Sequence, residues 1–411
     1  MRAAPARSHS IEPRVMSLDS LSPEAQLLLL TAGGDQNDAA IRALLAGPLD
    51  WAKLSWLSET ERATPVLWRR LLALGSLPEE AQPLHRMAMV AEFRMSHLES
   101  RLLAALDTLA AAGTDAVLLK GAALALTVYG SFVARPMSDV DLLVGRDKAA
   151  RARNALLASG WATGESDLAP EFYAGHHHLP PLVDAQGTGT SIELHTSLFF
   201  EGHPFNFSGD DIRRRAERVH VRGREILVPS VHDQLLHLCL HFAWSHMMAT
   251  GAWRAFRDLD ALVRTKRVQW REFTELARES RGGSACYWTF RLARRLAGIG
   301  VPEWVELALA PPEPEFALRR LEQHFTYDLL PTENISPSLW VTYSMWRLGL
   351  RPRWSGHGRV RPWDRADEFL GADRPGRVKR LIQHVRNAKS WTRYGRLVLL
   401  RPRDAEQRTA H

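Results

Sequence analysis

Cysteine is scarce in this sequence, and long apolar runs are absent. Only two of the 411 residues are cysteine, Cys239 and Cys286, and each lies in an apolar, helix-like segment without a second cysteine at metal-binding spacing. A disulfide framework needs more cysteines than this, so we interpret both as buried reduced thiols. The longest apolar runs, such as 27–30 and 122–126, are far shorter than the ~18 residues of a membrane-spanning helix.

A secretory signal is also missing from the N-terminal segment. Residues 1–15 include three arginines and few acids, but no apolar core of signal-peptide length. The sequence shows no internal repeat and no long low-complexity segment. Together with the reduced thiols, these absences argue against a secreted or membrane-spanning protein, and we expect a cytoplasmic one.

The composition is that of a basic globular protein. Hydrophobic residues make up 45% and charged residues 24% of the chain, and its length suggests two or three domains of ~150 residues each. The net charge is +7, with most of the excess from arginine. A basic protein favours anionic partners such as nucleotides, nucleic acid or a membrane surface. A genome of high GC content, which encodes arginine where other genomes encode lysine, would give the same charge balance.

Hydrophobic patterning divides the chain into three regions. Residues 1–95 have helical spacing, and Ser22-Pro23-Glu24 has the residue types of a helix start. Residues 96–229 alternate helices with short apolar strands, which indicates a sheet domain. Residues 230–411 are helical again and end in a basic tail. In the middle region we expect helices over 97–112, 121–129 and 147–159, and strands over 116–119, 138–144, 191–195 and 226–228.

Two carboxylates lie two residues apart at the start of an apolar strand, in the segment Ser-Asp-Val-Asp-Leu-Leu-Val over 138–144. Side chains alternate between the faces of a strand, so Asp139 and Asp141 point the same way. Like charges held side by side repel, and a divalent cation is the usual compensation. An isolated Asp-x-Asp is also compatible with a solvated strand edge or a loop, so its surroundings must decide.

Two other segments favour the metal-binding interpretation. Upstream, an apolar strand turns at Lys120-Gly121 into a helix, where a glycine would let a phosphate approach the backbone and the helix N-terminus. Downstream, Glu193 lies between Ile192 and Leu194 in an expected strand. A carboxylate in such a strand needs a partner, and a metal shared with the two aspartates would provide one.

These segments resemble the DNA-polymerase-β-like nucleotidyltransferase superfamily, and most closely a family of uncharacterised bacterial nucleotidyltransferases. The resemblance covers roughly 96–245 and extends more loosely to 259. It is carried by Leu119-Lys120-Gly121-Ala122-Ala123, Tyr129-Gly130, Arg135, the segment 139–144, His177-His178 with Pro180-Pro181, Ile192-Glu193-Leu194-His195, the segment 233–238 and Arg257-Asp258-Leu259.

The resemblance implies an α+β fold, with a minimal polymerase-β-like palm (a mixed sheet with helices) over 96–229 and helical regions over 1–95 and 230–411. It also implies transfer of a nucleoside monophosphate from an NTP, by default ATP, to the hydroxyl group of an acceptor. Asp139, Asp141 and Glu193 would bind Mg²⁺, with Mn²⁺ as an alternative. We expect a small molecule or a protein as the acceptor, and nucleic acid is possible but not favoured.

Lys120, Gly121 and Arg135 are candidates for nucleotide binding, because phosphate needs donors with a fixed positive charge or an accessible backbone. Most of the superfamily has Gly-Ser at this turn, where this chain has Gly121-Ala122. Lys120 could make the phosphate contact instead of the missing serine. Arg135 belongs to a turn just before the aspartate strand, so we expect it close to the site.

His195 completes the catalytic candidates. It lies two residues after Glu193, so both side chains share one face of the strand. It could orient the acceptor or act as a base near neutral pH. Equally, it could be satisfied by a hydrogen bond below the site.

Other histidines have weaker signals. His176-His177-His178 are consecutive, and neighbouring residues on a strand point to alternate faces, although these three could line the acceptor pocket. His237 and His241 have a zinc-binding spacing on a helix. The segment 232–246 is otherwise apolar and lacks the glutamate of a His-Glu-x-x-His protease. We therefore interpret His237 and His241 as packed core residues.

Two alternative functions remain compatible with the sequence. A non-catalytic nucleotide-binding or assembly protein could keep the same fold, and Ala122 mildly favours it. Nucleic-acid end modification is permitted by the basic tail, where ten Arg and Lys residues lie between 374 and 403. A solvated helix face explains the tail equally well. Metal binding without turnover would support the first alternative, and salt-sensitive RNA or DNA binding the second.

Overall fold

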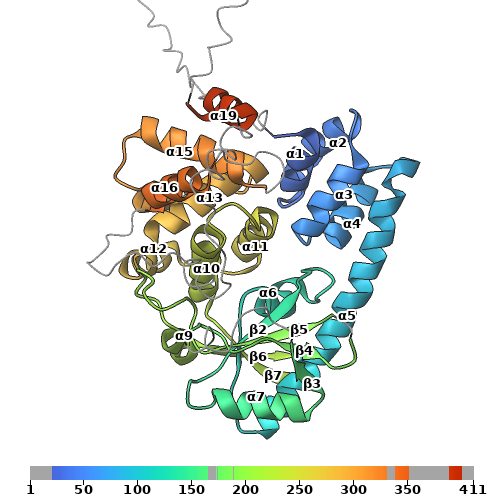
Figure 1. Cartoon of the computed structure of the whole chain (residues 1–411), viewed down its shortest axis with the longest axis vertical. Helices are drawn as coiled ribbons and strands as arrows, with labels where there is room; N and C mark the ends of the chain where they lie inside the picture. The colour runs from blue at the N-terminus through green and yellow to red at the C-terminus, as the bar shows by residue number, and fades with distance from the viewer. Residues whose placement is uncertain are drawn as a thin grey trace, which may run out of the picture.

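The structure, a computed structural model, describes residues 21–164, 173, 175–187, 189–330, 338–350 and 388–399. A mixed seven-stranded sheet occupies one end of the molecule, and helices from both halves of the chain gather over it (Figure 1). The fold is therefore of the α+β class, which confirms the expectation from the sequence.

The sheet has the strand order β3-β4-β5-β2-β1-β7-β6. Its strands are β1 (Val117–Leu118), β2 (Asp139–Leu143), β3 (Trp161–Thr163), β4 (Leu182–Asp184), β5 (Ser191–His195), β6 (Glu217–Val221) and β7 (Arg224–Val228). In the centre, β2 runs parallel to β5 and antiparallel to β1, and β1 runs parallel to β7. The other neighbouring strands pair antiparallel.

The two faces of the central strands have different neighbours. Val140 and Leu142 of β2 and Leu194 of β5 are buried in one hydrophobic cluster with residues of helices α5 (Gln82–Ala111) and α7 (Ala149–Ala158). Because side chains alternate along a strand, the polar residues between them point to the other face of the sheet. The helices of the third region lie over that face (Figure 1).

The helices over the sheet come from the beginning and the end of the chain. They are α1 (Pro23–Leu30), η2 (Asp35–Asn37), α2 (Asp38–Leu45), α3 (Trp51–Thr60), α4 (Thr64–Leu74), η3 (Glu79–Ala81), α10 (Val231–Leu240), η5 (His241–Ser245), α11 (Ala252–Thr265), α12 (Trp270–Glu279), α13 (Gly283–Ala297), α14 (Glu303–Leu309), α15 (Glu315–Asp328), α16 (Leu339–Leu350), α19 (Ala388–Tyr394) and η6 (Gly395–Leu399). Leu28 of α1, Trp253 of α11 and Trp288 of α13 belong to one buried hydrophobic cluster, so helices from both ends of the sequence pack together. The remaining helical elements are α6 (Lys120–Leu124), η4 (Ala125–Tyr129) and α9 (Gly209–Arg215), which connect strands of the sheet.

Most expected elements of the middle region are present, but one helix is much longer than expected. The helix expected from 97 begins at Gln82, because Pro83 fits the first turn of a helix and no breaker follows it. The sequence reading missed β3, β4 and β6. The first two have three residues each, and β6 alternates charged with apolar residues at an exposed edge. Arg222-Gly223, both with positive φ, form the two-residue turn into β7.

Cys239 and Cys286 are buried and free, as expected. Within the described part of the chain, every helix is too short or too polar to cross a membrane. The segments 1–15 and 351–363 and the residues 374–387 and 400–403 of the basic tail lie outside the described residues.

Candidate active site

Strand register brings two of the predicted carboxylates directly together. Asp141 of β2 is the partner of Glu193 on the parallel strand β5. Asp139, two residues earlier on β2, lies on the same face, and its Oδ1 accepts a hydrogen bond of 2.6 Å from Ser138 Oγ. All three side chains line one cavity. The expected convergence of three carboxylates on one sheet face is therefore present in the structure.

Lys120 neutralises the middle carboxylate. Its Nζ donates to Asp141 Oδ1 over 2.8 Å. The Lys120 backbone has φ of +47°, a left-handed conformation that costs a non-glycine residue roughly 1–2 kcal/mol. This strained residue lies where β1 turns into α6, and strain of this kind gathers at functional sites. The turn thus directs the ammonium group onto the carboxylates.

His195 lies beneath the carboxylates, fully buried. Its Nε2 lies 2.7 Å from Asp141 Oδ1 and its Nδ1 lies 3.4 Å from the carbonyl of Ser197. Both oxygens only accept, so both ring nitrogens donate and the ring is an imidazolium. Burial and the charge of Lys120 act to lower the pKa of His195, but its hydrogen bonds to Asp141 and Glu193 outweigh them and raise it.

The same contacts set the protonation of the carboxylates. Burial alone would raise the pKa of Asp141, but Lys120 and His195 hold it well below its usual range. The pKa of Asp139 is instead raised, by burial and by the negative charge of Asp141. Ionisation of Asp139 is therefore disfavoured by its repulsion from Asp141, and a cation bound between the two carboxylates would remove this repulsion.

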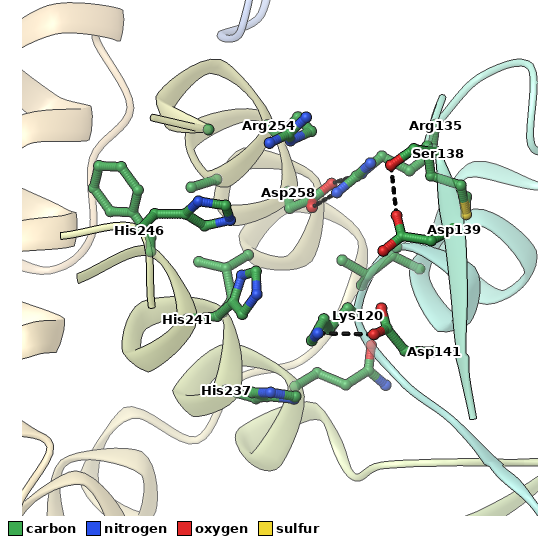
Figure 2. A pocket seen from close by; sticks show the side chains of 18 of the residues that line it. Lys120, Arg135, Ser138, Asp139, Asp141, His237, His241, His246, Arg254 and Asp258 are labelled. Carbon is green, nitrogen blue, oxygen red and sulfur yellow. Dashed lines mark hydrogen bonds and ion pairs between the residues drawn. The ribbon is translucent and has the colours of Figure 1, made fainter. Parts of the chain in front are cut away.

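The cavity has a volume of about 340 Å³, within the range of small-molecule sites. One wall comes from the sheet and the opposite wall comes from α10, η5 and α11 (Figure 2). Its lining residues are Lys120, Gly121, Leu124, Arg135, Met137, Ser138, Asp139, Asp141, His177, Glu193, Pro229, Gln234, His237, Leu238, His241, Phe242, His246, Gly251, Arg254, Ala255 and Asp258. Of the predicted site residues, only His195 is not part of this lining.

A protein-family model described as "Uncharacterised nucleotidyltransferase" matches residues 47–298, more than half of the chain. The chain belongs to this nucleotidyltransferase family. It is therefore an enzyme that transfers phosphorus-containing groups, and a nucleotide is among its substrates. No curated protein and no solved structure matches the chain. The family match spans the sheet carboxylates and also the helices that form the opposite wall.

The donor set of this nucleotidyltransferase fits a divalent metal ion, which such enzymes generally use. Carboxylate oxygens are the ligands that Mg²⁺ and Mn²⁺ prefer. The candidate ligand atoms of Asp141, Glu193 and His195 lie within 4.8 Å of one another, and Asp139 shares their sheet face. A bound cation would relieve the repulsion between Asp139 and Asp141, which favours its binding. Asp139, Asp141 and Glu193 would therefore hold it.

Arg135 lines the cavity, but its guanidinium group is already engaged. Its Nε and Nη2 each donate to Asp258 over 2.7 Å, and its Nη1 donates to the Pro136 carbonyl over 2.7 Å. The same guanidinium lies against Gly121, where an added Cβ would be 3.4 Å from Nη1. Arg135 thus joins the sheet to α11, a link that was not apparent from the sequence.

Three histidines on the helical wall also face the cavity. His237 is buried as expected, but it lines the cavity together with His241 and His246 (Figure 2). Burial lowers the pKa of His237 to about 3 and that of His246 to about 4, so both are neutral. The backbone of His246 donates to the His241 carbonyl, five residues back. This π-turn keeps His246 on the cavity side, where a regular α-helix would rotate it away.

The histidine run 176–178 lies beside the carboxylates and is not part of a regular strand. The candidate ligand atoms of its three residues lie within 4.8 Å of one another, so they converge and do not alternate. His178 Nε2 lies 3.7 Å from Glu193 Oε2, and His177 lines the cavity. These three side chains therefore do not follow the alternation of a strand, because the chain turns here.

Sequence reasoning gave no role to Arg254 and Glu61. Arg254 lies in the first turn of α11 and lines the cavity. Glu61 is buried at the end of α3 and accepts hydrogen bonds from the backbone N–H groups of Gly251 and Trp253. Neither residue belongs to a local motif, and they meet only because α3 packs near the start of α11. No pattern in the sequence could have identified them.

Proposed function

We propose that this enzyme moves a nucleoside monophosphate from an NTP to the hydroxyl group of an acceptor and depends on Mg²⁺ or Mn²⁺. ATP is the default donor, chosen for its abundance. The acceptor would be a small molecule or a protein side chain.

One observation carries the proposal: Asp141 and Glu193 are direct partners on parallel strands, with Asp139 on the same face, and all three open into one cavity. Three carboxylates in one partly buried place repel one another, so a stable protein keeps them there only with cationic compensation. Lys120 and His195 supply part of it. A divalent metal ion would complete it.

In the proposed reaction, the acceptor oxygen forms a bond to the α-phosphorus while the bond from that phosphorus to the bridging oxygen breaks. Pyrophosphate leaves with the electron pair, and the hydroxyl proton passes to solvent water. A divalent metal bound by Asp139, Asp141 and Glu193 would neutralise the phosphate charge and favour deprotonation of the hydroxyl. Lys120 fixes the carboxylate of Asp141 and would meet the phosphates from the same position.

His195 suits a positioning role in this reaction. It is fully buried, it does not line the cavity, and both of its ring nitrogens point at acceptors. An imidazolium in this state has no lone pair to take the acceptor's proton. It would instead hold Asp141 and Glu193 in place from below.

The test is ligand-dependent stability of the wild type and of Asp141→Asn, each with Mg²⁺ and each of the four NTPs in turn. A ligand at ~100 times its dissociation constant adds about 2.7 kcal/mol, which raises the melting temperature measurably. We expect a metal-dependent rise with at least one NTP in the wild type and little or none in the variant. A folded wild type that no NTP stabilises at millimolar concentration would refute the proposal.

A further inference from the structure

The two walls of the cavity differ in the charge that they leave unpaired. On the sheet wall, Glu193 pairs with His195, but Asp139 forms no salt bridge with any described residue. Three cationic side chains line the cavity, and two of them are paired: Lys120 with Asp141, and Arg135 with Asp258. The third, Arg254, belongs to the helical wall.

Arg254 forms no hydrogen bond and no salt bridge with any described residue, although it is partly buried. Figure 2 shows its guanidinium group near the top of the cavity, between His246 and the Ser138–Asp139 end of β2. Burial lowers the pKa of Arg254, and the negative charges of Glu61 and Asp139 act against this effect without outweighing it. A partly buried guanidinium without an acceptor is unfavourable, which points to an anionic ligand.

Two neighbours fix the position of Arg254. Glu61 accepts from Gly251 N over 2.8 Å and from Trp253 N over 3.0 Å, so it anchors the first turn of α11. Gly251 has φ of +74°, and a Cβ at this position would lie 3.1 Å from Arg254 Nη2. A larger residue there would be strained and would press on the guanidinium. The start of α11 is therefore built to hold this arginine in place.

The histidines beside Arg254 suit a phosphate as well. His241 and His246 line the cavity, and burial keeps both neutral. A neutral imidazole can donate one N–H to a phosphate oxygen without carrying a charge of its own. On His246, Nδ1 pairs with Thr250 Oγ1 over 2.9 Å. The helical wall thus offers one fixed positive charge surrounded by neutral groups that can donate.

We propose that Arg254 binds the β- and γ-phosphates of the nucleotide, on the side of the cavity opposite the carboxylates. The inference rests on the proposed function, because it divides the cavity between a metal-binding wall and a phosphate-binding wall. The α-phosphate lies between them, close to the metal ligands. When the bond to the α-phosphorus breaks, Arg254 holds the charge that develops on the leaving pyrophosphate.

The test compares wild type, Arg254→Gln and Arg254→Lys by titration calorimetry with ATP, ADP and AMP, each with Mg²⁺, and with inorganic tripolyphosphate. If another NTP stabilises the wild type best, that NTP and its di- and monophosphate replace ATP, ADP and AMP in the titrations. Loss of a charge-assisted hydrogen bond should weaken ATP binding about 10- to 100-fold in Arg254→Gln. The affinity of Arg254→Gln for AMP, which lacks the β- and γ-phosphates, should fall less than about threefold. Arg254→Lys should recover part of the ATP affinity.

Arg271→Gln is the matched control. Arg271 is an exposed arginine of α12 outside the cavity, and its loss removes the same charge. This variant should bind ATP as the wild type does. Circular dichroism of each variant verifies the fold before binding is measured.

The outcomes separate this inference from the proposed function. A wild type that binds ATP, with Arg254→Gln binding it equally well, overturns the role of Arg254 alone. Equal losses for ATP and AMP also overturn it, because they indicate a structural effect or a contact to the α-phosphate. A wild type that binds no NTP overturns the proposed function. In that case, Arg254-dependent binding of tripolyphosphate would still support an anion site, and no such binding would refute both.

Discussion

At the scale of single residues, the site is a balance of charges around Asp141. This carboxylate accepts from Lys120 on one side and from His195 below, while Glu193 lies opposite it on the neighbouring strand. The ammonium and the imidazolium stabilise the ionised form of Asp141. Removal of either cationic group should lower both the free energy of unfolding and the ligand affinity, because each compensates for the repulsion between the carboxylates.

We predict a pH-dependent contribution of His195 to stability. Its pKa is raised on folding from the usual 6.5. The stabilisation is therefore fully present below pH 6.5 and is lost as pH rises through the folded-state pKa. In EDTA at pH 6, His195→Asn should lower the free energy of unfolding by about 1–3 kcal/mol. The difference from the wild type should shrink as pH rises above 6.5, as measured by denaturant unfolding.

His220→Asn serves as the control for this prediction, since His220 is exposed on β6. It should leave the free energy of unfolding almost unchanged across the same pH range. If the His195→Asn difference instead grew with pH, the ring would be neutral in the folded protein and the assignment as an imidazolium would be wrong.

At the scale of elements, the start of α11 is the least regular part of the site. Met247 and Met248 both have positive φ, and Gly251 follows with φ of +74°. The two strained methionines and this glycine lie between the π-turn that carries His246 and the helix that carries Arg254. Strain near a functional site persists only where surrounding contacts hold it. Glu61 supplies two of those contacts from α3.

We predict that Glu61→Gln will loosen this element. The variant places an amide N–H₂ group against two backbone N–H donors, so at least one buried donor loses its acceptor. The free energy of unfolding should fall by about 1–3 kcal/mol, and nucleotide affinity should fall with it because Arg254 is held less firmly. Thermal unfolding and calorimetry measure the two effects.

Glu59→Gln is the matched control, because Glu59 is exposed two residues earlier on the same helix. Its effect on unfolding should stay within about 0.5 kcal/mol. A Glu61→Gln protein as stable as this control would show that the two backbone hydrogen bonds do not anchor α11.

At the scale of the whole molecule, the sheet and the helical layer meet through a buried ion pair. Arg135, just before β2, binds Asp258 of α11 through two nitrogens, and Tyr129 Oη donates to the same carboxylate over 2.9 Å. Arg257 of α11 donates to the Ala134 carbonyl over 2.7 Å. These contacts set the position of the helical wall relative to the sheet carboxylates, so they set the width of the cavity.

We predict that Asp258→Asn will destabilise the protein strongly, because it leaves the guanidinium of Arg135 buried without its counter-charge. Breaking a buried ion pair in this way costs about 3–5 kcal/mol. The matched variant is Asp260→Asn on the same helix, whose carboxylate pairs with the exposed Arg264. That change should cost less than about 1 kcal/mol. Denaturant unfolding of both variants measures the difference, and equal effects would contradict the proposed link.

The sequence by itself determined the sheet wall of the site. Side-chain alternation along a strand depends only on local geometry, so Asp139 and Asp141 had to share a face, and Glu193 had to share one with His195. The glycine turn at 120–121 and the short apolar strands are local signals as well. The same local signals indicated a sheet domain in the middle region, and the family resemblance implied the α+β class, although short edge strands such as β3 carried too few residues for a pattern.

Only the tertiary structure decided the helical wall. Glu61 lies far in sequence from His246 and Arg254, and it meets their segment because the helices share one hydrophobic core with the rest of the layer. Packing of this kind depends on the shapes of many apolar side chains that are spread along the sequence. It therefore has no local sequence motif. The pairing of Arg135 with Asp258, over a separation of 123 residues, has the same origin. Local periodicity therefore predicts which residues share an element face, and tertiary packing determines which faces enclose the cavity.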